Sequence, residues 1–127
     1  MTLGGKAEAY SQVTKKLSSA VVHSVLTGRV DARMIEALDR DATLLGWAPS
    51  WLIDATNILG FTPDSVPAGV RTLESGRSKG LRRIVIITKL PAARMAARTI
   101  GLAASVDLHV ADDRRAADEL LATPLRR

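Results

Sequence analysis

Apolar runs rich in Ile and Val alternate along this chain with segments in which apolar residues recur every three or four positions. Residues 51–53 (WLI) and 84–88 (IVIIT) show no alternation of apolar and polar side chains, which is typical of strands buried on both faces. Residues 106–110 (VDLHV) form a further predicted strand, and each of these strands is followed by a segment with helical spacing. Because parallel strands need crossover connections, the alternation favours a mostly parallel sheet with helices packed on it.

The N-terminal part of the sequence predicts a β-hairpin ahead of this pattern. Residues 10–16 and 20–27 read as strands separated by a Leu-Ser-Ser turn. Gly28 is expected to end the second strand, and Asp31 is expected to cap a helix. The predicted order is ββαβαβαβα, in a small α/β domain with a mixed, mostly parallel sheet. We expect this domain to span residues 10–122, with an N-terminal extension (1–9) and a C-terminal tail (123–127).

Two prolines limit the helix that follows the third strand. If Thr62 were its cap, Pro67 would stand in the fifth helical position, where the missing N–H and the ring would cost about 3 kcal/mol. Asp64 or Ser65 is therefore the predicted cap, and Gly80 is the predicted end of the helix.

Similar signals bound the remaining helices. Pro91 is expected to open one helix and Gly101 to end it, while Asp112 or Asp113 caps the last. Asp54 is expected at the end of the third strand. The apolar stripes predicted for the four helices consist of Met34, Ile35, Leu38, Ala42 and Leu45; Val66, Val70 and Leu73; Met95, Ala96, Thr99 and Ile100; and Ala116, Ala117, Leu120 and Leu121.

Composition excludes several kinds of chemistry. The chain of 127 residues contains no cysteine, so disulfides, thiolate zinc sites and thiol catalysis are impossible, and its 46% apolar content suits a domain that needs no covalent support. No apolar run approaches the roughly 20 residues of a membrane span. Residues 1–10 show neither a signal-peptide core nor a glycine at position 2. We expect a cytoplasmic protein that is neither secreted nor anchored.

Enzyme motifs are absent from the sequence. Residues 4–6 (GGK) lack the spacing of a phosphate-binding loop, and residues 76–80 (GRSKG) fall at the end of a predicted helix, where the dipole repels anions. His23 and His109 lie in different predicted strands, and Asp54 has no partner acid nearby in sequence. We therefore predict no catalytic residue, no cofactor and no metal site.

Several spaced motifs do match a known pattern. Residues 28–31 (GRVD) form a turn into the first helix, and residues 51–61 (WLIDATNILGF) place an acid at Asp54 and an apolar residue at Phe61. Residues 90–102 (LPAARMAARTIGL) and 111–121 (ADDRRAADELL) follow in order without gaps. In these features the chain resembles the STAS domain, the fold of anti-sigma-factor antagonists, over roughly residues 10–121, and residues 51–61 look like its third strand.

The resemblance implies a non-enzymatic regulator that docks onto another protein, such as an anti-sigma-factor kinase or a related signalling component. It implies no cofactor and leaves the oligomeric state open. By analogy, the partner-binding residues come from three turns: Gly28, Arg29 and Asp31; Thr62, Pro63, Asp64 and Ser65; and Lys89.

The chain departs from the family at its phosphorylation switch. Family members that act as switches carry Asp-Ser-Ser-Gly there and are phosphorylated on the first serine. An alignment without gaps places Thr62 at the aspartate, Pro63 at the switch serine, Asp64 at the second serine and Ser65 at the glycine, so the acceptor is lost. A slip of two residues would pair Asp64 and Ser65 with Asp-Ser, at the expense of an insertion before the loop and a shortened helix after it. Ser65 and Thr62 remain the possible phosphorylation sites.

Other interpretations of the same residues stay open. Asp64 and Ser65 can act merely as helix caps, each worth about 1 kcal/mol. A lipid-binding or small-molecule module would require a pocket between the sheet and its helices. Residues 71–98 hold eight Lys or Arg against one acid, in a chain of net charge +5, although aromatic residues for base stacking amount to only 3%. A nucleic-acid-binding module would use Arg71, Arg77, Lys79, Arg82 and Arg83.

Overall fold

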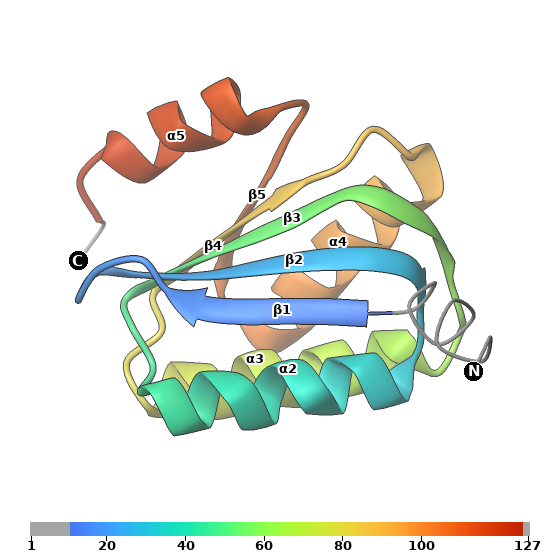
Figure 1. Cartoon of the computed structure of the whole chain (residues 1–127), viewed down its shortest axis with the longest axis horizontal. Coiled ribbons are helices and arrows are strands. Elements are labelled where there is room, and N and C mark those ends of the chain that lie inside the picture. The colour runs from blue at the N-terminus through green and yellow to red at the C-terminus, as the bar shows by residue number, and fades with distance from the viewer. Residues whose placement is uncertain (1–10, 126–127) are drawn as a thin grey trace, which may run out of the picture.

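The strands of residues 11–125, the part of the chain that this computed structural model describes, pair in the order in which they occur in the sequence. The first two strands are antiparallel and every other pair is parallel (Figure 1). The predicted order of elements and the predicted mixed α/β sheet are confirmed. The elements are β1 (Ser11–Lys16), β2 (Val21–Val30), α2 (Ala32–Leu45), β3 (Ser50–Phe61), α3 (Ser65–Ser78), β4 (Arg83–Ile87), α4 (Pro91–Ala104), β5 (Asp107–Ala111) and α5 (Arg114–Ala122).

The two faces of the sheet are covered unequally. Helices α2, α3 and α4 pack on one face, and the nine-residue α5 lies alone on the other (Figure 1). In β3, Trp51 and Ile53 belong to the larger core beneath α2 to α4, whereas Leu52 belongs to the smaller core beneath α5. This burial on both faces explains why apolar and polar residues do not alternate at the start of β3.

Strand β2 is longer than the sequence predicted. Gly28 does not end it, because the parallel pairing with β3 continues through Gly28 to Val30. The register shifts between Gly28 and Arg29, and Gly28 has a φ of 88°, a conformation that costs glycine little. The irregularity therefore lies inside the strand and not at its end.

Strand β3 also continues past its predicted end. Asp54 lies in its interior, paired with Val25 and Ile87, and the strand runs on to Phe61 as the family resemblance implied. The apolar run stops at Ile53, but backbone pairing with β2 does not need apolar side chains. The predicted position of Asp54 at a strand end is therefore wrong.

Helix α4 packs through a face that overlaps the predicted one only in part, because Ala96 and Ile100 are half-buried toward the core while Met95 and Thr99 are exposed. Its buried residues are small, namely Ala93, Ala97, Gly101 and Ala104. A Cβ on Gly101 would lie 2.6 Å from Leu108 Cβ, so glycine is required by the close approach of α4 to β5. The helix ends only at Ser105, which adopts the left-handed conformation with a φ of 58°. Gly101 as the helix end is thus wrong, and three residues of the predicted stripes are exposed: Leu45, Met95 and Thr99.

The bounds of the other elements lie close to the predicted ones. Strands β4 and β5 are displaced by one residue from the predicted ranges, and Asp113 caps α5 by accepting a hydrogen bond from the Ala116 N–H at 2.8 Å. Pro91 opens α4 as predicted. Tyr10, the first residue predicted for the hairpin, lies outside the described residues.

Arg83 attaches α5 to the sheet. Its side chain is buried, and its guanidinium donates to the carbonyl oxygens of Leu120, Leu121 and Thr123 at 3.0, 2.9 and 2.8 Å. These carbonyls stand at the C-terminal end of α5, where the helix dipole is negative and favours a cation. Arg83 is therefore not available to nucleic acid, contrary to the basic-module interpretation.

We expect Arg83→Met to lower the free energy of unfolding by about 3 kcal/mol, because three carbonyls at the end of α5 lose a charged donor while the apolar stem is kept. Urea denaturation followed by far-ultraviolet circular dichroism measures the loss. Arg71→Met, at an exposed position of α3, serves as the matched control. Equal stability of the two variants would contradict the role given to Arg83.

Candidate docking site at the ends of β2 and β3

Two of the three predicted partner-binding segments meet where β2 and β3 end. The backbone N–H of Thr62 donates to the carbonyl oxygen of Val30 at 2.9 Å. The turn at residues 28–31 and the loop at residues 62–65 therefore lie side by side, next to the starts of α2 and α3 (Figure 1).

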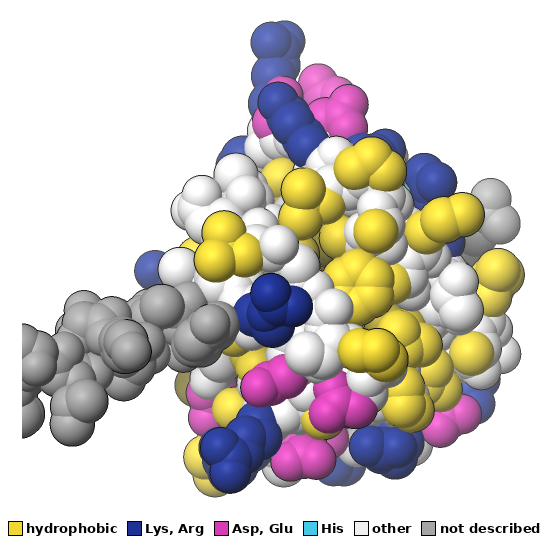
Figure 2. All heavy atoms as spheres, turned by 90° about the vertical axis from the view of Figure 1, so that its right-hand side faces the viewer, with side chains coloured by type: hydrophobic (Ala, Val, Ile, Leu, Met, Phe, Trp, Pro, Cys, Tyr) yellow, Lys and Arg dark blue, Asp and Glu magenta, His cyan; other side chains and the backbone are white. Residues whose placement is uncertain are grey.

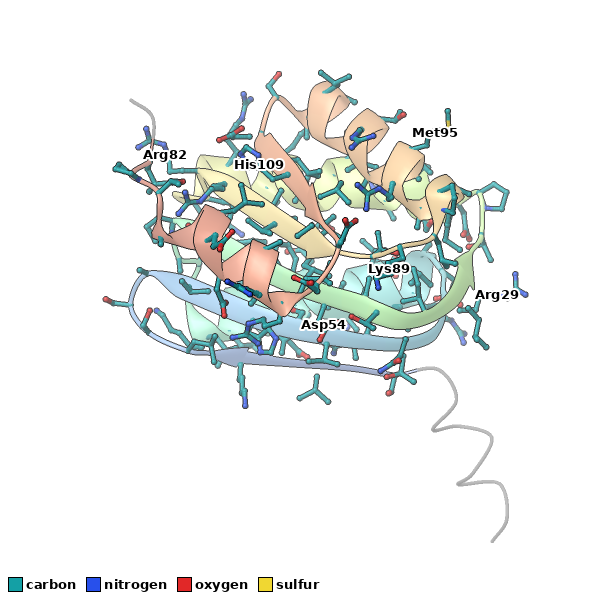
Figure 3. The ribbon with its side chains drawn as sticks, turned by 90° about the horizontal axis from the view of Figure 1, so that it is seen from above. Arg29, Asp54, Arg82, Lys89, Met95 and His109 are labelled. Carbon is teal, nitrogen blue, oxygen red and sulfur yellow. The ribbon has the colours of Figure 1, made fainter. Side chains whose placement is uncertain are left out.

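Lys89, the third predicted segment, lies apart from the other two. Strand β4 ends at Ile87, which pairs with Asp54, whereas β3 continues to Phe61. Lys89 is exposed just after β4, and Figure 3 shows it set back from Arg29 along the long axis of the molecule. The structure thus joins the first two segments and leaves Lys89 at a distance from them.

Within residues 28–31, only Arg29 is fully exposed. Gly28 and Val30 are buried in β2, and the Asp31 side chain accepts a hydrogen bond from the Met34 N–H at 2.9 Å. Asp31 therefore caps α2 as predicted. Figure 3 shows Arg29 at the end of the molecule, so this residue is the one in the turn that can meet a partner.

Asp64 occupies the cap position of α3 but does not cap the helix with its side chain. Its backbone is already helical, with φ −70° and ψ −13°, and its carboxylate makes no hydrogen bond to the helix backbone. Instead, the Thr62 hydroxyl donates to this carboxylate. A capping residue normally has extended backbone angles that aim its oxygen at the first turn. The predicted position of the cap is confirmed, but the predicted capping bond is wrong.

The first turn of α3 offers no free amide to an anion. The Ser65 N–H donates to the Thr62 carbonyl at 3.0 Å, and the Val66 N–H donates to that of Pro63 at 3.2 Å. Pro67 has no N–H, and the next amide, that of Ala68, donates to the Asp64 carbonyl. A helix terminus binds a phosphate or a carboxylate through unpaired amides, and the amides of Ser65, Val66 and Ala68 are already bonded.

Ser65 is not presented to solvent. Only 4% of its surface is exposed, and its hydroxyl donates to the Thr62 carbonyl oxygen at 2.6 Å. Pro63 and Asp64 are the exposed residues of the loop. What the loop presents is therefore a rigid proline beside a carboxylate that Thr62 holds in place.

Hydrophobic side chains accompany these charges, and the sequence did not predict them at the surface. Figure 2 shows this end of the molecule, where hydrophobic side chains gather to one side and carboxylates lie below them. Leu59 at the end of β3 is 75% exposed, and Met95 on α4 is 71% exposed. In β3, Leu59 follows the buried Ile58, so the alternation of side chains along the strand places Leu59 on the opposite face, which α5 covers only in part.

Three further titratable side chains of residues 11–125 lie outside the docking site, namely Asp54, His23 and His109. Asp54 accepts hydrogen bonds from the backbone N–H and the hydroxyl of Thr56, at 3.0 and 2.5 Å. His23 is buried in β2, and burial followed by the positive charge of Arg114 lowers its pKa, which keeps the ring neutral. His109 lies 3.1 Å from Asp107 at the other edge of the sheet. In residues 11–125, no three His, Asp or Glu side chains gather as metal ligands would.

The sequence matches no protein-family model and no curated protein. Among solved structures, an anti-sigma factor antagonist from Mycobacterium paratuberculosis aligns with a TM-score of 0.62 at 16% identity, over 89% of this chain and 96% of that one. The unphosphorylated anti-sigma factor antagonist SpoIIAA aligns at 0.63 and 12% identity, over 89% and 100%. An uncharacterised DUF3478-family protein with a SpoIIAA-like fold, from Shewanella loihica, aligns at 0.61 and 17% identity, over 90% and 94%.

These likenesses define the class of fold. The chain has the STAS fold of SpoIIAA-like proteins and anti-sigma factor antagonists, as the sequence motifs predicted. Among the described residues, no helix is both long and apolar enough to cross a membrane.

The cap positions of α2 and α3, Asp31 and Asp64, provide a test of the loop geometry. Helices α2 and α3 each have 14 residues, but only Asp31 makes a capping hydrogen bond. We expect Asp31→Ala to lower the free energy of unfolding by about 1–2 kcal/mol, and Asp64→Ala by about 0.5 kcal/mol or less. Urea denaturation of both variants measures the difference. An equal loss would show that Asp64 also caps its helix.

Proposed function

We propose that this protein is a non-enzymatic cytoplasmic regulator that binds another protein through Arg29, Pro63 and Asp64, hereafter the docking surface. The observation that carries the proposal is the hydrogen bond from the Thr62 N–H to the Val30 carbonyl, which holds two exposed and opposite charges on adjoining segments. The fold shared with anti-sigma factor antagonists supports a signalling partner such as an anti-sigma factor or its kinase.

The chemistry of the docking surface defines what the partner must offer. Asp64 is a fixed carboxylate with no role in capping α3, so it is available to a Lys or Arg of the partner. For Arg29, the partner must offer an acid. The exposed Leu59, nearby in β3, supplies apolar area. Charged pairs of this kind determine orientation and specificity, while apolar burial supplies most of the affinity.

Binding in this proposal is not controlled by phosphorylation of the loop. Pro63, at the position of the switch serine in the alignment without gaps, has no hydroxyl. The Ser65 hydroxyl is buried and hydrogen-bonded, so a kinase would have to unfold the start of α3 to reach it. The fixed charge of Asp64 also opposes a phosphate at Thr62 or Ser65.

Charge reversal tests the docking surface. We expect Arg29→Glu and Asp64→Lys each to abolish capture of the partner from a lysate of the native host, because each places like charges in contact. The free energy of unfolding of Arg29→Glu should stay within about 0.5 kcal/mol of the parent, since the position is exposed. That of Asp64→Lys should fall by no more than about 1.5 kcal/mol, because a cation opposes the dipole at the start of α3. Arg71→Glu and Glu74→Lys, at exposed positions further along α3, are the matched controls. Loss of the partner in the controls as well would contradict the assigned surface.

The loop chemistry predicts an unmodified protein. We expect intact-mass analysis of material purified from the native host, followed by peptide mapping, to show no phosphate on Thr62 or Ser65. Stoichiometric phosphate on Ser65 would contradict the prediction and support the slipped alignment, in which Ser65 is the switch residue.

A further inference from the structure

Two cavities lie between the sheet and helices α2, α3 and α4. Their volumes are about 110 and 70 Å³. They adjoin, because they share the lining side chains Ile35, Leu38, Ile53, Ile86 and Ile100. An engineered apolar cavity of about 150 Å³ binds benzene or xenon, so this pair is large enough for a small ligand.

The lining restricts the chemistry of that ligand. Within residues 11–125, no charged side chain borders either cavity. Of the hydroxyl groups in the larger cavity, Ser65 already donates to the Thr62 carbonyl, and Thr88 accepts from the Leu90 N–H at 3.3 Å. A water molecule needs two to four polar partners, which this lining does not supply. The space therefore suits an uncharged apolar molecule.

The larger cavity lies directly beneath the docking surface. Its lining includes Val30 from the end of β2, Phe61 just before the loop of residues 62–65, Ser65 at the end of that loop, and Thr88 next to Lys89. Each predicted partner-binding segment thus has a residue, or the neighbour of one, in the wall of this cavity. Phe61 and Ile100, which also line this cavity, are half-buried.

We propose that the cavity pair binds an uncharged, benzene-sized apolar ligand, and that the bound ligand shifts the segments that form the docking surface. The binding itself does not depend on the proposed function, whereas the regulatory consequence rests on it. Occupancy acts through packing, since a ligand in contact with Phe61 and Ser65 changes the position of both ends of the loop.

Titration of the full chain with benzene, followed by methyl and amide NMR spectra, tests both parts. We expect saturable shifts of the Ile53, Ile86 and Ile100 methyl groups, and none at Val85 or Ile87, which do not border either cavity. The amides of Val30 and Ser65 should shift with the same saturation. Methyl shifts without these amide shifts would overturn the regulatory part, and the absence of saturable methyl shifts would overturn the binding site.

A pair of variants on α4 locates the ligand. Ala97 borders the larger cavity and is buried, whereas Ala103 on the same helix is exposed. We expect Ala97→Leu to abolish the benzene shifts and Ala103→Leu to retain them. If Ala97→Leu does not fold, Ala96→Leu, at a half-buried lining position, takes its place. A folded lining variant that still binds benzene as the parent does would overturn the site.

The two proposals fail separately. Benzene binding is measured without a partner, so failure of the charge-reversal experiment would leave the cavity intact as a ligand site. Conversely, loss of benzene binding with partner capture unchanged would leave the docking surface standing and remove only its control by a ligand.

Discussion

The long parallel pairing of β2 with β3 determines the geometry of the candidate site. The pairing continues to Val30 and Phe61, well beyond the point at which β3 leaves β4. Because both strands end together, the chain enters α2 and α3 from neighbouring positions, and the Thr62 N–H can reach the Val30 carbonyl. A shorter β2 would separate Arg29 from Asp64 and leave the larger cavity without the wall that Val30 supplies.

The opposite face of the sheet is organised by a single cation. Helix α5 buries little apolar surface, with Ala117 as its one buried residue, and its C-terminal carbonyls are bound by Arg83 from β4. Among residues 11–125, no acid forms an ion pair with Arg83. Burial of such a guanidinium is ordinarily unfavourable, but several oriented carbonyls at a helix end supply the compensating negative potential. The α5 face therefore depends on directional hydrogen bonds, whereas the face beneath α2 to α4 depends on apolar packing.

The sequence predicted the order of the elements because that order depends on local periodicity and on turn residues such as Pro91 and Asp113. It failed where a neighbouring segment decides the outcome. Gly101 has the composition of a helix end, but the close approach of Leu108 makes it a buried packing residue. Arg83 carries no local sign of burial, and the capping bond of Asp64 is lost because its backbone is helical. In the site, the segments were predictable from the motifs, whereas the inaccessibility of Ser65 was not.

The loop of residues 62–65 adjoins the larger cavity through Ser65. Pro63 and Pro67 have no N–H to donate, and the amides of Ser65, Val66 and Ala68 are bonded within the loop and the first turn of α3. The apolar space of about 110 Å³ leaves the side chains around it with fewer packing contacts than a filled core would give them. A core built from Ala and Ile could close that space with one larger side chain at Ala97. Departures from close packing concentrate at functional sites, and here the departure adjoins the segments whose exposed charges are the candidate contacts.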